Sequence, residues 1–139
     1  MHRNPPDTEL RALLGSTRTI AVVGASSNPE RSSHVVMGKL LSAGYRVIPV
    51  NPNETEVLGQ RAYASLAEVP EPIDLVDVFR SPEHTPAIAD QSVAVGARAL
   101  WLQSGIVNED AAARADAGGL VVVMDACIAV VHSLLRVGR

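Results

Sequence analysis

Short aliphatic runs that alternate with helical patterns are the feature that most constrains the fold of this chain. Five runs are rich in valine, isoleucine, leucine or alanine, and they cover residues 20–23, 45–50, 73–79, 99–103 and 120–124. Runs of this length and composition are typical of buried strands. Apolar residues at helical spacing follow them over residues 32–43, 81–95, 108–118 and 127–135. Because strand–helix–strand units join parallel strands, the sequence predicts a single three-layer α/β domain with a five-stranded parallel sheet.

The predicted domain covers residues 1–139 and includes an N-terminal helix and one polar segment besides the strands and helices named above. Leu10, Leu13 and Leu14 predict a short docking helix within residues 1–15, with Asp7 or Thr8 as its cap and a stop at Gly15, against a core of residues 19–136. Residues 53–71 are polar and predicted to be irregular, with a helical turn at 65–68. We find no internal repeat or linker.

Composition excludes several classes of protein. Hydrophobic residues make up 47% of the chain but aromatic residues only 3%, and the net charge is −3. A nucleic-acid platform needs a basic groove and stacking rings, so we expect no nucleic-acid partner. The N-terminus has no apolar stretch of a secretion signal, and no run is long enough to span a bilayer. The single cysteine, Cys127, fits a reducing compartment, so we expect a cytoplasmic protein with no membrane partner.

The loop after the first strand is the strongest local indication of a ligand site. It reads Gly24-Ala25-Ser26-Ser27-Asn28-Pro29 and leads into a predicted helix. Backbone N–H groups at such a junction favour an anion, so we interpret the loop as a nucleotide phosphate cradle. The loop keeps only the first glycine of the dinucleotide fingerprint, and an ordinary strand-to-helix turn stays open as an alternative.

The other strand ends should meet this loop, because ligands of open parallel sheets bind at the carboxyl ends of the strands. Where an NAD site usually holds an acid, the second strand ends in Asn51-Pro52, and the nearest acid is Glu54. A neutral residue there permits a ribose that carries a phosphate. Arg31 and Arg80 lie in loops at this edge and could bind that phosphate. Lys39 and Arg46 are interpreted as solvated residues.

The joint order of several motifs resembles a known family. The motifs are Val22-Val23-Gly24-Ala25-Ser26, Arg31-Ser32-Ser33-His34, Val47-Ile48-Pro49-Val50-Asn51-Pro52, Asp74-Leu75-Val76-Asp77-Val78-Phe79-Arg80, Trp101-Leu102-Gln103-Ser104-Gly105-Ile106 and Val122-Val123-Met124-Asp125-Ala126-Cys127. Over residues 6 to 136 they resemble the stand-alone CoA-binding domain proteins, which are Rossmann-like and similar to the CoA-binding domain of the succinyl-CoA synthetase alpha subunit. The resemblance implies a Rossmann-like fold that binds coenzyme A or an acyl-CoA.

The resemblance also implies the binding residues. The glycine loop should lie near the phosphates and the Val-Asn-Pro segment near the adenosine. Carried over position by position, the site comprises Gly24, Ala25, Ser26, Ser27, Arg31, His34, Asn51, Pro52, Phe79, Arg80, Gln103 and Ser104. The chain ends at Arg139, before the ligase part and the phosphohistidine segment of the synthetase. We therefore expect no ligase activity from this chain alone, and whether it catalyses any other reaction stays open.

Candidates for chemistry are few. Cys127 should lie near a helix N-terminus, where it is either a packed residue or a reactive thiol that forms a mixed disulfide with CoA. His34 could contact a phosphate, act as a general base or cap its helix. Asp74 and Asp77, three residues apart in a strand, point to opposite faces and form no dyad. The histidines and the cysteine have no metal-ligand spacing, so no metal is expected.

Three functions stay open from the sequence. The first is a CoA-binding module without catalysis of its own. The second is an NAD(P)-dependent oxidoreductase, against which the missing glycines and the missing ribose acid argue. The third is a redox-regulatory protein that carries a CoA mixed disulfide at Cys127. The partner protein and the oligomeric state are unknown from the sequence.

Overall fold

Five parallel strands form the central sheet of the computed structural model, which describes residues 1–138. Across the sheet they run β2 (Arg46–Val50), β1 (Thr19–Val23), β5 (Leu75–Val78), β6 (Ala99–Leu102) and β7 (Val121–Val123). Every neighbouring pair is parallel. The predicted Rossmann-like α/β domain is confirmed. The order of the strands reverses between β1 and β5, which is where such sheets bind ligands.

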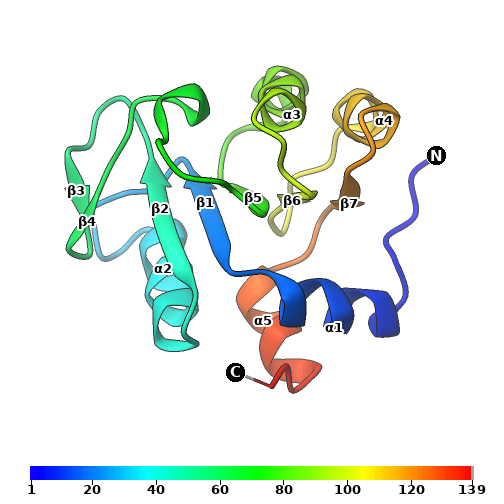
Figure 1. Cartoon of the computed structure of the whole chain (residues 1–139), viewed down its shortest axis with the longest axis horizontal. Coiled ribbons are helices and arrows are strands. Elements are labelled where there is room, and N and C mark those ends of the chain that lie inside the picture. The colour runs from blue at the N-terminus through cyan, green and yellow to red at the C-terminus, as the bar shows by residue number, and fades with distance from the viewer. Residues whose placement is uncertain (139) are drawn as a thin grey trace.

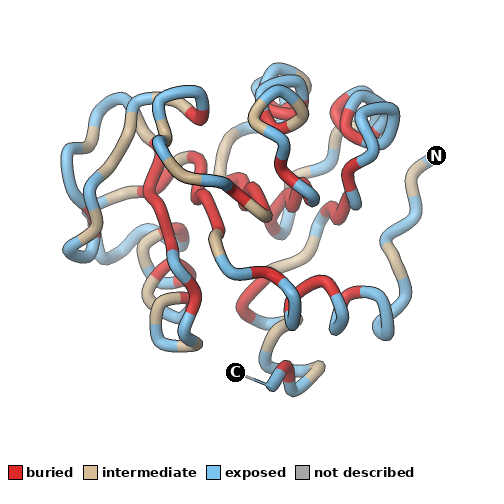
Figure 2. The backbone as a smooth tube through the Cα atoms, viewed as in Figure 1, coloured by how far each residue is buried: buried red, intermediate tan, exposed pale blue. Residues whose placement is uncertain are grey.

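Helices cover both faces of this sheet (Figure 1). On one face lie α1 (Asp7–Ser16), α2 (Ser32–Ser42) and α5 (Ile128–Leu134), and on the other lie α3 (Thr85–Ala94) and α4 (Glu109–Ala117). Alternate residues of a strand point to opposite faces, so each strand contributes to two cores. In β6, Ala99 and Trp101 enter the core under α1, α2 and α5, whereas Leu100 and Leu102 enter the core under α3 and α4. Figure 2 shows the buried residues concentrated along the strands.

The first helix differs from its prediction at both ends. Pro6, not Asp7 or Thr8, occupies the N-cap, in the extended conformation that the proline ring favours. The helix passes Gly15 and ends at Ser16, where the Leu13 carbonyl accepts the N–H of Thr17 at 3.0 Å and its hydroxyl at 2.8 Å. As predicted, Leu10, Leu13 and Leu14 bury this helix against the sheet.

The other helices follow the sequence more closely. Asn108 caps α4 as predicted, because its Oδ1 accepts the N–H of Ala111 at 2.9 Å. The helix expected from residue 81 is divided into a 3₁₀ turn, η2 (Pro82–His84), and α3. No helix within residues 1–138 has the length and apolar character that a membrane span requires.

Residues 53–71 are more regular than the sequence predicts. They contain an antiparallel hairpin, β3 (Glu56–Val57) and β4 (Gln60–Arg61), and the expected turn, η1 (Leu66–Glu68). Leu58 and Gly59 turn the hairpin with φ of 51° and 77°, as a type I′ turn requires. The segment returns to the sheet where the Tyr63 carbonyl accepts the N–H of Asn51 at 2.9 Å, and so covers the edge of β2.

Candidate functional site

Three adjoining pockets line the carboxyl ends of β1, β2, β5 and β6. The Gly24–Asn51 pocket has a volume of about 260 Å³, the Arg31 pocket about 230 Å³, and the Phe79–Cys127 pocket about 390 Å³. Neighbouring pockets share walls. Gly24 and Asn51 line the first two pockets, and Phe79 lines the second and third. Together they follow the edge at which the strand order reverses.

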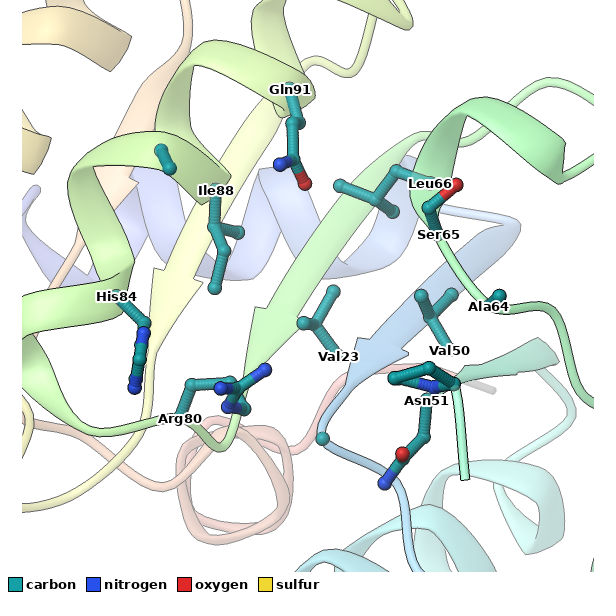
Figure 3. Close-up of a pocket in the computed structure, with 13 residues that line it drawn as sticks. Val23, Val50, Asn51, Ala64, Ser65, Leu66, Arg80, His84, Ile88 and Gln91 are labelled. Atoms are coloured by element: carbon teal, nitrogen blue, oxygen red, sulfur yellow. The ribbon is translucent and has the colours of Figure 1, made fainter. Parts of the chain in front are cut away.

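The Gly24–Asn51 pocket lies between the two central loops and α3. Its lining residues are Val23, Gly24, Val50, Asn51, Pro52, Ala64, Ser65, Leu66, Arg80, His84, Ala87, Ile88 and Gln91. Figure 3 shows Arg80 and His84 on one side of the pocket and Val50 and Asn51 on the other. Aliphatic side chains form much of its wall, which suits a flat apolar ring system with polar groups at its rim.

Gly24 brings two of the loops into direct contact. Its φ is +90°, and a Cβ built there would lie 2.6 Å from the carbonyl oxygen of Phe79. The Gly24 N–H donates to the Val50 carbonyl at 2.9 Å, so the residue bridges the ends of β2 and β5. A side chain would therefore push apart the strand ends that form the pockets. This close approach explains why the first glycine is present although the other glycines of the dinucleotide fingerprint are absent.

Asn51 fixes the second loop against the first. Its Nδ2 donates to the Ala25 carbonyl at 2.8 Å, and its Oδ1 accepts the N–H of Asn53 at 2.9 Å. His34 holds the other side of the glycine loop through a contact of 2.9 Å between Nδ1 and the Ser26 carbonyl. These contacts define the shape of the loop before any ligand enters it, and such preorganisation favours binding.

The side chain of Glu54 already accepts hydrogen bonds from Ser27 of the glycine loop. The Glu54 carboxylate accepts from the Ser27 N–H at 2.8 Å and from the Ser27 hydroxyl at 3.0 Å. Ser27 is exposed and lies outside the three pockets, whereas Ser26 lines the Arg31 pocket. The Glu54 carboxylate therefore adds negative charge next to a loop that otherwise favours an anion.

Two arginines bring positive charge to the same edge. Arg31, at the N-cap of α2, lines the Arg31 pocket with Ser32 and Ser33, and Arg80 lines the two larger pockets. Within residues 1–138, neither guanidinium has an ion pair or a side-chain hydrogen bond with the protein. Both can therefore bind an anion without losing an internal partner. By contrast, Arg46 pairs with Glu71 at 3.0 Å on the surface.

The Phe79–Cys127 pocket continues the site toward β6 and α5. It is lined by Ser32, Val36, Phe79, Arg80, Ser81, Gln103, Ser104, Ile106 and Cys127. Gln103 is buried, and its Oε1 accepts the N–H of Ile128 at 3.1 Å. Asp125, with φ of 54°, accepts the N–H of Gly105 at 2.7 Å and so connects the loops after β6 and β7. Apolar side chains and small polar groups therefore share this end of the site.

Comparisons with known proteins decide the family. Residues 18–133 match the family described as CoA binding domain. The chain belongs to the CoA-binding domain family. It is 42% identical to the uncharacterised protein YneT of Bacillus subtilis over 96% of this chain and 99% of that protein. The family resemblance inferred from the sequence is thus confirmed.

Further relatives include both short and long proteins. A solved structure of a hypothetical protein from Pyrococcus horikoshii superposes on this CoA-binding domain with a TM-score of 0.93 and 37% identity, over 98% of each chain. The alpha subunit of ADP-forming acetate–CoA ligase II from Pyrococcus furiosus is 44% identical over 59 residues, which are 42% of this chain and 13% of that subunit. The domain is therefore related in part to a much longer ligase subunit.

Most residues predicted for the site line the three pockets of this CoA-binding domain. Nine do so: Gly24, Ser26, Arg31, Asn51, Pro52, Phe79, Arg80, Gln103 and Ser104. The other three do not. Ala25 is fully buried, Ser27 is paired with Glu54, and His34 holds the Ser26 carbonyl. Whether any of the twelve binds a ligand stays a prediction.

The sequence missed two groups of pocket residues in this CoA-binding domain. Ala64, Ser65 and Leu66 enter the Gly24–Asn51 pocket from the segment predicted to be irregular, and His84 enters it from η2. The second group lies in α3, where Ile88 and Gln91 form the far wall. No strand-end rule indicates such residues. The only sequence signal for the first group is Leu66, an apolar residue within a polar segment.

Asp77 is an acidic residue whose complete burial the sequence did not predict. The structure agrees that Asp74 and Asp77 form no dyad. Asp74 accepts the N–H groups of Arg18 and Thr19 at the amino end of the sheet. Asp77, in contrast, is fully buried in β5, and neither of its carboxylate oxygens has a hydrogen-bond partner. Burial and, second, the nearby Cys127 raise the pKa of Asp77 well above its usual range.

Proposed function

We propose that this protein binds coenzyme A or an acyl-CoA along the three pockets at the carboxyl edge of its sheet. The observation that carries the proposal is the row of three pockets joined at Gly24 and Phe79, with the unpaired Arg31 and Arg80 on its walls. Membership of the CoA-binding domain family supports the ligand. CoA carries a diphosphate and a ribose phosphate, which require cationic groups and oriented N–H donors.

The chemistry of each pocket suggests how the ligand would lie. The adenosine would occupy the Gly24–Asn51 pocket against Val50 and Ile88, and the phosphates would lie in the Arg31 pocket beside Ser26 and Ser32. The pantetheine arm would follow the Phe79–Cys127 pocket, whose Phe79, Val36 and Ile106 offer apolar contacts. This orientation brings the thiol end of the ligand toward Ser104 and Cys127.

Thermal unfolding with separate ligands tests the proposal. A ligand that binds only the folded state raises the unfolding midpoint, by an amount that grows with its concentration relative to Kd. We expect CoA to raise the midpoint clearly more than NAD or NADP at equal concentration. A rise with NADP and none with CoA would instead favour an oxidoreductase that uses this cofactor.

Arginine variants test the location of the phosphates. We expect Arg31→Ala to weaken CoA binding by roughly tenfold, because it removes a charged hydrogen-bond donor. Arg98→Ala is the matched control, since Arg98 precedes β6 at the opposite edge of the sheet. If Arg31→Ala changes the CoA affinity by less than about twofold, Arg31 is the wrong cation, and Arg80 becomes the residue to test.

A redox role of Cys127 is a second candidate, favoured by the position of this half-buried thiol in the wall of the Phe79–Cys127 pocket. Incubation with CoA disulfide, followed by intact-mass measurement, tests it. We expect one CoA to be added to the wild type and none to Cys127→Ser. An unmodified wild type would remove this candidate but leave reversible CoA binding unaffected.

A further inference from the structure

The two sides of the Gly24–Asn51 pocket differ in charge. Arg80 and His84 lie on one side of the pocket, and Asn51 lies on the other (Figure 3). Glu54 follows Asn51 in a turn, where its N–H donates to the Asn51 carbonyl at 3.2 Å and its carboxylate accepts from the glycine loop. An anion that enters this pocket is therefore attracted toward the side of Arg80 and repelled from the side of Asn51.

The Arg80 side chain crosses over the glycine loop. A Cβ built at Gly24 would lie 3.2 Å from the Arg80 Cδ, so the aliphatic stem of the arginine packs on the glycine backbone. Of the three pockets, Arg80 lines the Gly24–Asn51 pocket and the Phe79–Cys127 pocket, whereas Arg31 lines the Arg31 pocket alone. The two arginines thus offer positive charge at two different places along the edge of the sheet.

The 3₁₀ turn η2 holds His84 at the wall of the same pocket. The His84 N–H donates to the Ser81 carbonyl at 3.0 Å. The Pro82 carbonyl accepts the Thr85 hydroxyl at 2.7 Å and the Asn108 side chain at 3.0 Å. The turn is therefore tied to the start of α3 and to the cap of α4, and these contacts fix the backbone from which His84 enters the pocket.

Neither side chain is committed to a strong internal partner. Within residues 1–138, the Arg80 guanidinium has no ion pair or side-chain hydrogen bond, and the His84 ring has no hydrogen bond. The His84 Nε2 lies 4.0 Å from the Glu83 Oε1 in an exposed pair, and such pairs contribute little. Glu83 does not line the pocket. Both side chains can therefore bind a phosphate at little cost in internal contacts.

CoA carries two separate groups of phosphates, and the pockets offer a place for each. The diphosphate joins the adenosine to the pantetheine arm, so it belongs in the Arg31 pocket, between the other two pockets. The remaining phosphate is attached to the ribose of the adenosine and therefore belongs at the rim of the Gly24–Asn51 pocket. Among the residues that line this pocket, Arg80 and His84 are the two that can carry positive charge.

We propose that Arg80 and His84 form the binding subsite for the ribose phosphate of CoA, and that they make the protein prefer CoA over dephospho-CoA. The inference rests on the proposed function and adds His84, which lies outside the set of residues predicted from the sequence. Arg80 supplies a permanent charge and parallel N–H donors that match two phosphate oxygens. The His84 ring supplies a further N–H donor from the same side of the pocket.

Calorimetric titration of the full chain with CoA and with dephospho-CoA tests the inference, because the two ligands differ only in the ribose phosphate. We expect the wild type to bind CoA roughly tenfold or more tightly, since hydrogen bonds to charged groups contribute strongly. Arg80→Gln removes the charge but keeps the stem that packs on Gly24. Arg80→Gln and His84→Ala should each reduce the preference for CoA by roughly threefold or more, and leave the affinity for dephospho-CoA within about twofold of the wild type.

A control and the contrary outcomes separate this inference from the proposed function. Arg98→Ala removes a positive charge at the opposite edge of the sheet, before β6, and should keep the wild-type preference. Equal affinity of the wild type for both ligands overturns the inference and leaves the proposed function standing. A preference that persists in both Arg80→Gln and His84→Ala also overturns it. Binding of neither ligand removes the proposed function itself, and the inference with it.

The two bisphosphates of adenosine distinguish the ribose phosphate of CoA from that of NADP. Adenosine 3′,5′-bisphosphate has the arrangement of CoA, adenosine 2′,5′-bisphosphate has that of NADP, and AMP has no ribose phosphate. We expect the 3′,5′ isomer to bind more tightly than the other two, and Arg80→Gln and His84→Ala to remove this difference. Tighter binding of the 2′,5′ isomer alone would overturn the inference.

Discussion

The backbone of Gly24 lies against the carbonyl group of Phe79, with room for a hydrogen but not for a methyl group. A Cβ at Gly24 would be 2.6 Å from the Phe79 oxygen, and the φ of +90° is one that other residues rarely adopt. These two residues connect the carboxyl ends of β1 and β5, between which the strand order reverses. The position of all three pockets depends on this contact.

Substitution of this glycine should therefore damage both stability and binding. We expect Gly24→Ala to lower the free energy of unfolding by roughly 1–3 kcal/mol, from backbone strain and the displaced Phe79 carbonyl. Urea unfolding measures the loss. The control is Gly15→Ala, because Gly15 lies in α1 with nothing within 4 Å of a built Cβ, and it should be neutral or stabilising. Equal stability of the two variants would contradict the packing described here.

Asn51 should matter for the shape of the glycine loop. Asn51→Ala removes the donor to the Ala25 carbonyl and the acceptor of the Asn53 N–H, so we expect a loss of about 1–2 kcal/mol in stability. CoA affinity, measured by calorimetry, should fall with it. Asn53→Ala, an exposed change in the same turn, is the control. An unchanged affinity for CoA in Asn51→Ala would show that the loop is shaped without this side chain.

Glu54 should oppose the binding of an anion next to Ser27. Glu54→Gln removes a negative charge but keeps an oxygen that can accept from the Ser27 N–H and hydroxyl. We expect CoA affinity to rise severalfold at low salt and the gain to shrink at high salt, because screening weakens the repulsion. Glu56→Gln, in the nearby β3, tests whether any charge change in this region has the same effect. Weaker binding by Glu54→Gln would mean that its carboxylate supports the loop more than it repels the ligand.

The buried Asp77 predicts a pH dependence of stability. Burial, with the Cys127 thiol, raises its pKa in the folded state, so the favourable contribution of its proton is complete below the unfolded value near pH 4. As pH rises, the unfolded chain releases this proton and the folded chain keeps it, so stability falls until the folded pKa is passed. The free energy of unfolding of Asp77→Asn should therefore rise relative to that of the wild type, by up to about 1.4 kcal/mol for each pH unit above pH 4.

Urea unfolding of both proteins from pH 5 to 8 checks this prediction. The gap between the two free energies of unfolding should widen steadily with pH. The free energy of unfolding of Asp116→Asn should change with pH in the same way as that of the wild type, since Asp116 is exposed on α4. A constant gap for Asp77→Asn would show that Asp77 is ionised in the folded protein.

The sequence by itself determined the architecture. Five aliphatic runs with helical patterns between them can bury their side chains only as a parallel sheet covered on both faces, and the residues that follow those runs must then share one edge. For this reason the sequence alone places Gly24, Asn51, Phe79, Arg80 and Gln103 at one edge of the sheet. The sequence also predicts the Asn108 cap, because its hydrogen bond joins residues only three positions apart.

Only the tertiary structure decided what surrounds those residues. Leu66 and Gln91 approach the pocket from elements distant in sequence, and no local pattern encodes that approach. The hairpin between Glu56 and Arg61 is two residues long on each side, too short to show an alternating pattern. The sequence alone indicates an ordinary strand residue at Asp77, and its complete burial arises only when the sheet assembles and Trp101 of β6 becomes its register partner. Local patterns thus determine the elements, whereas burial and charge depend on contacts between distant parts of the chain.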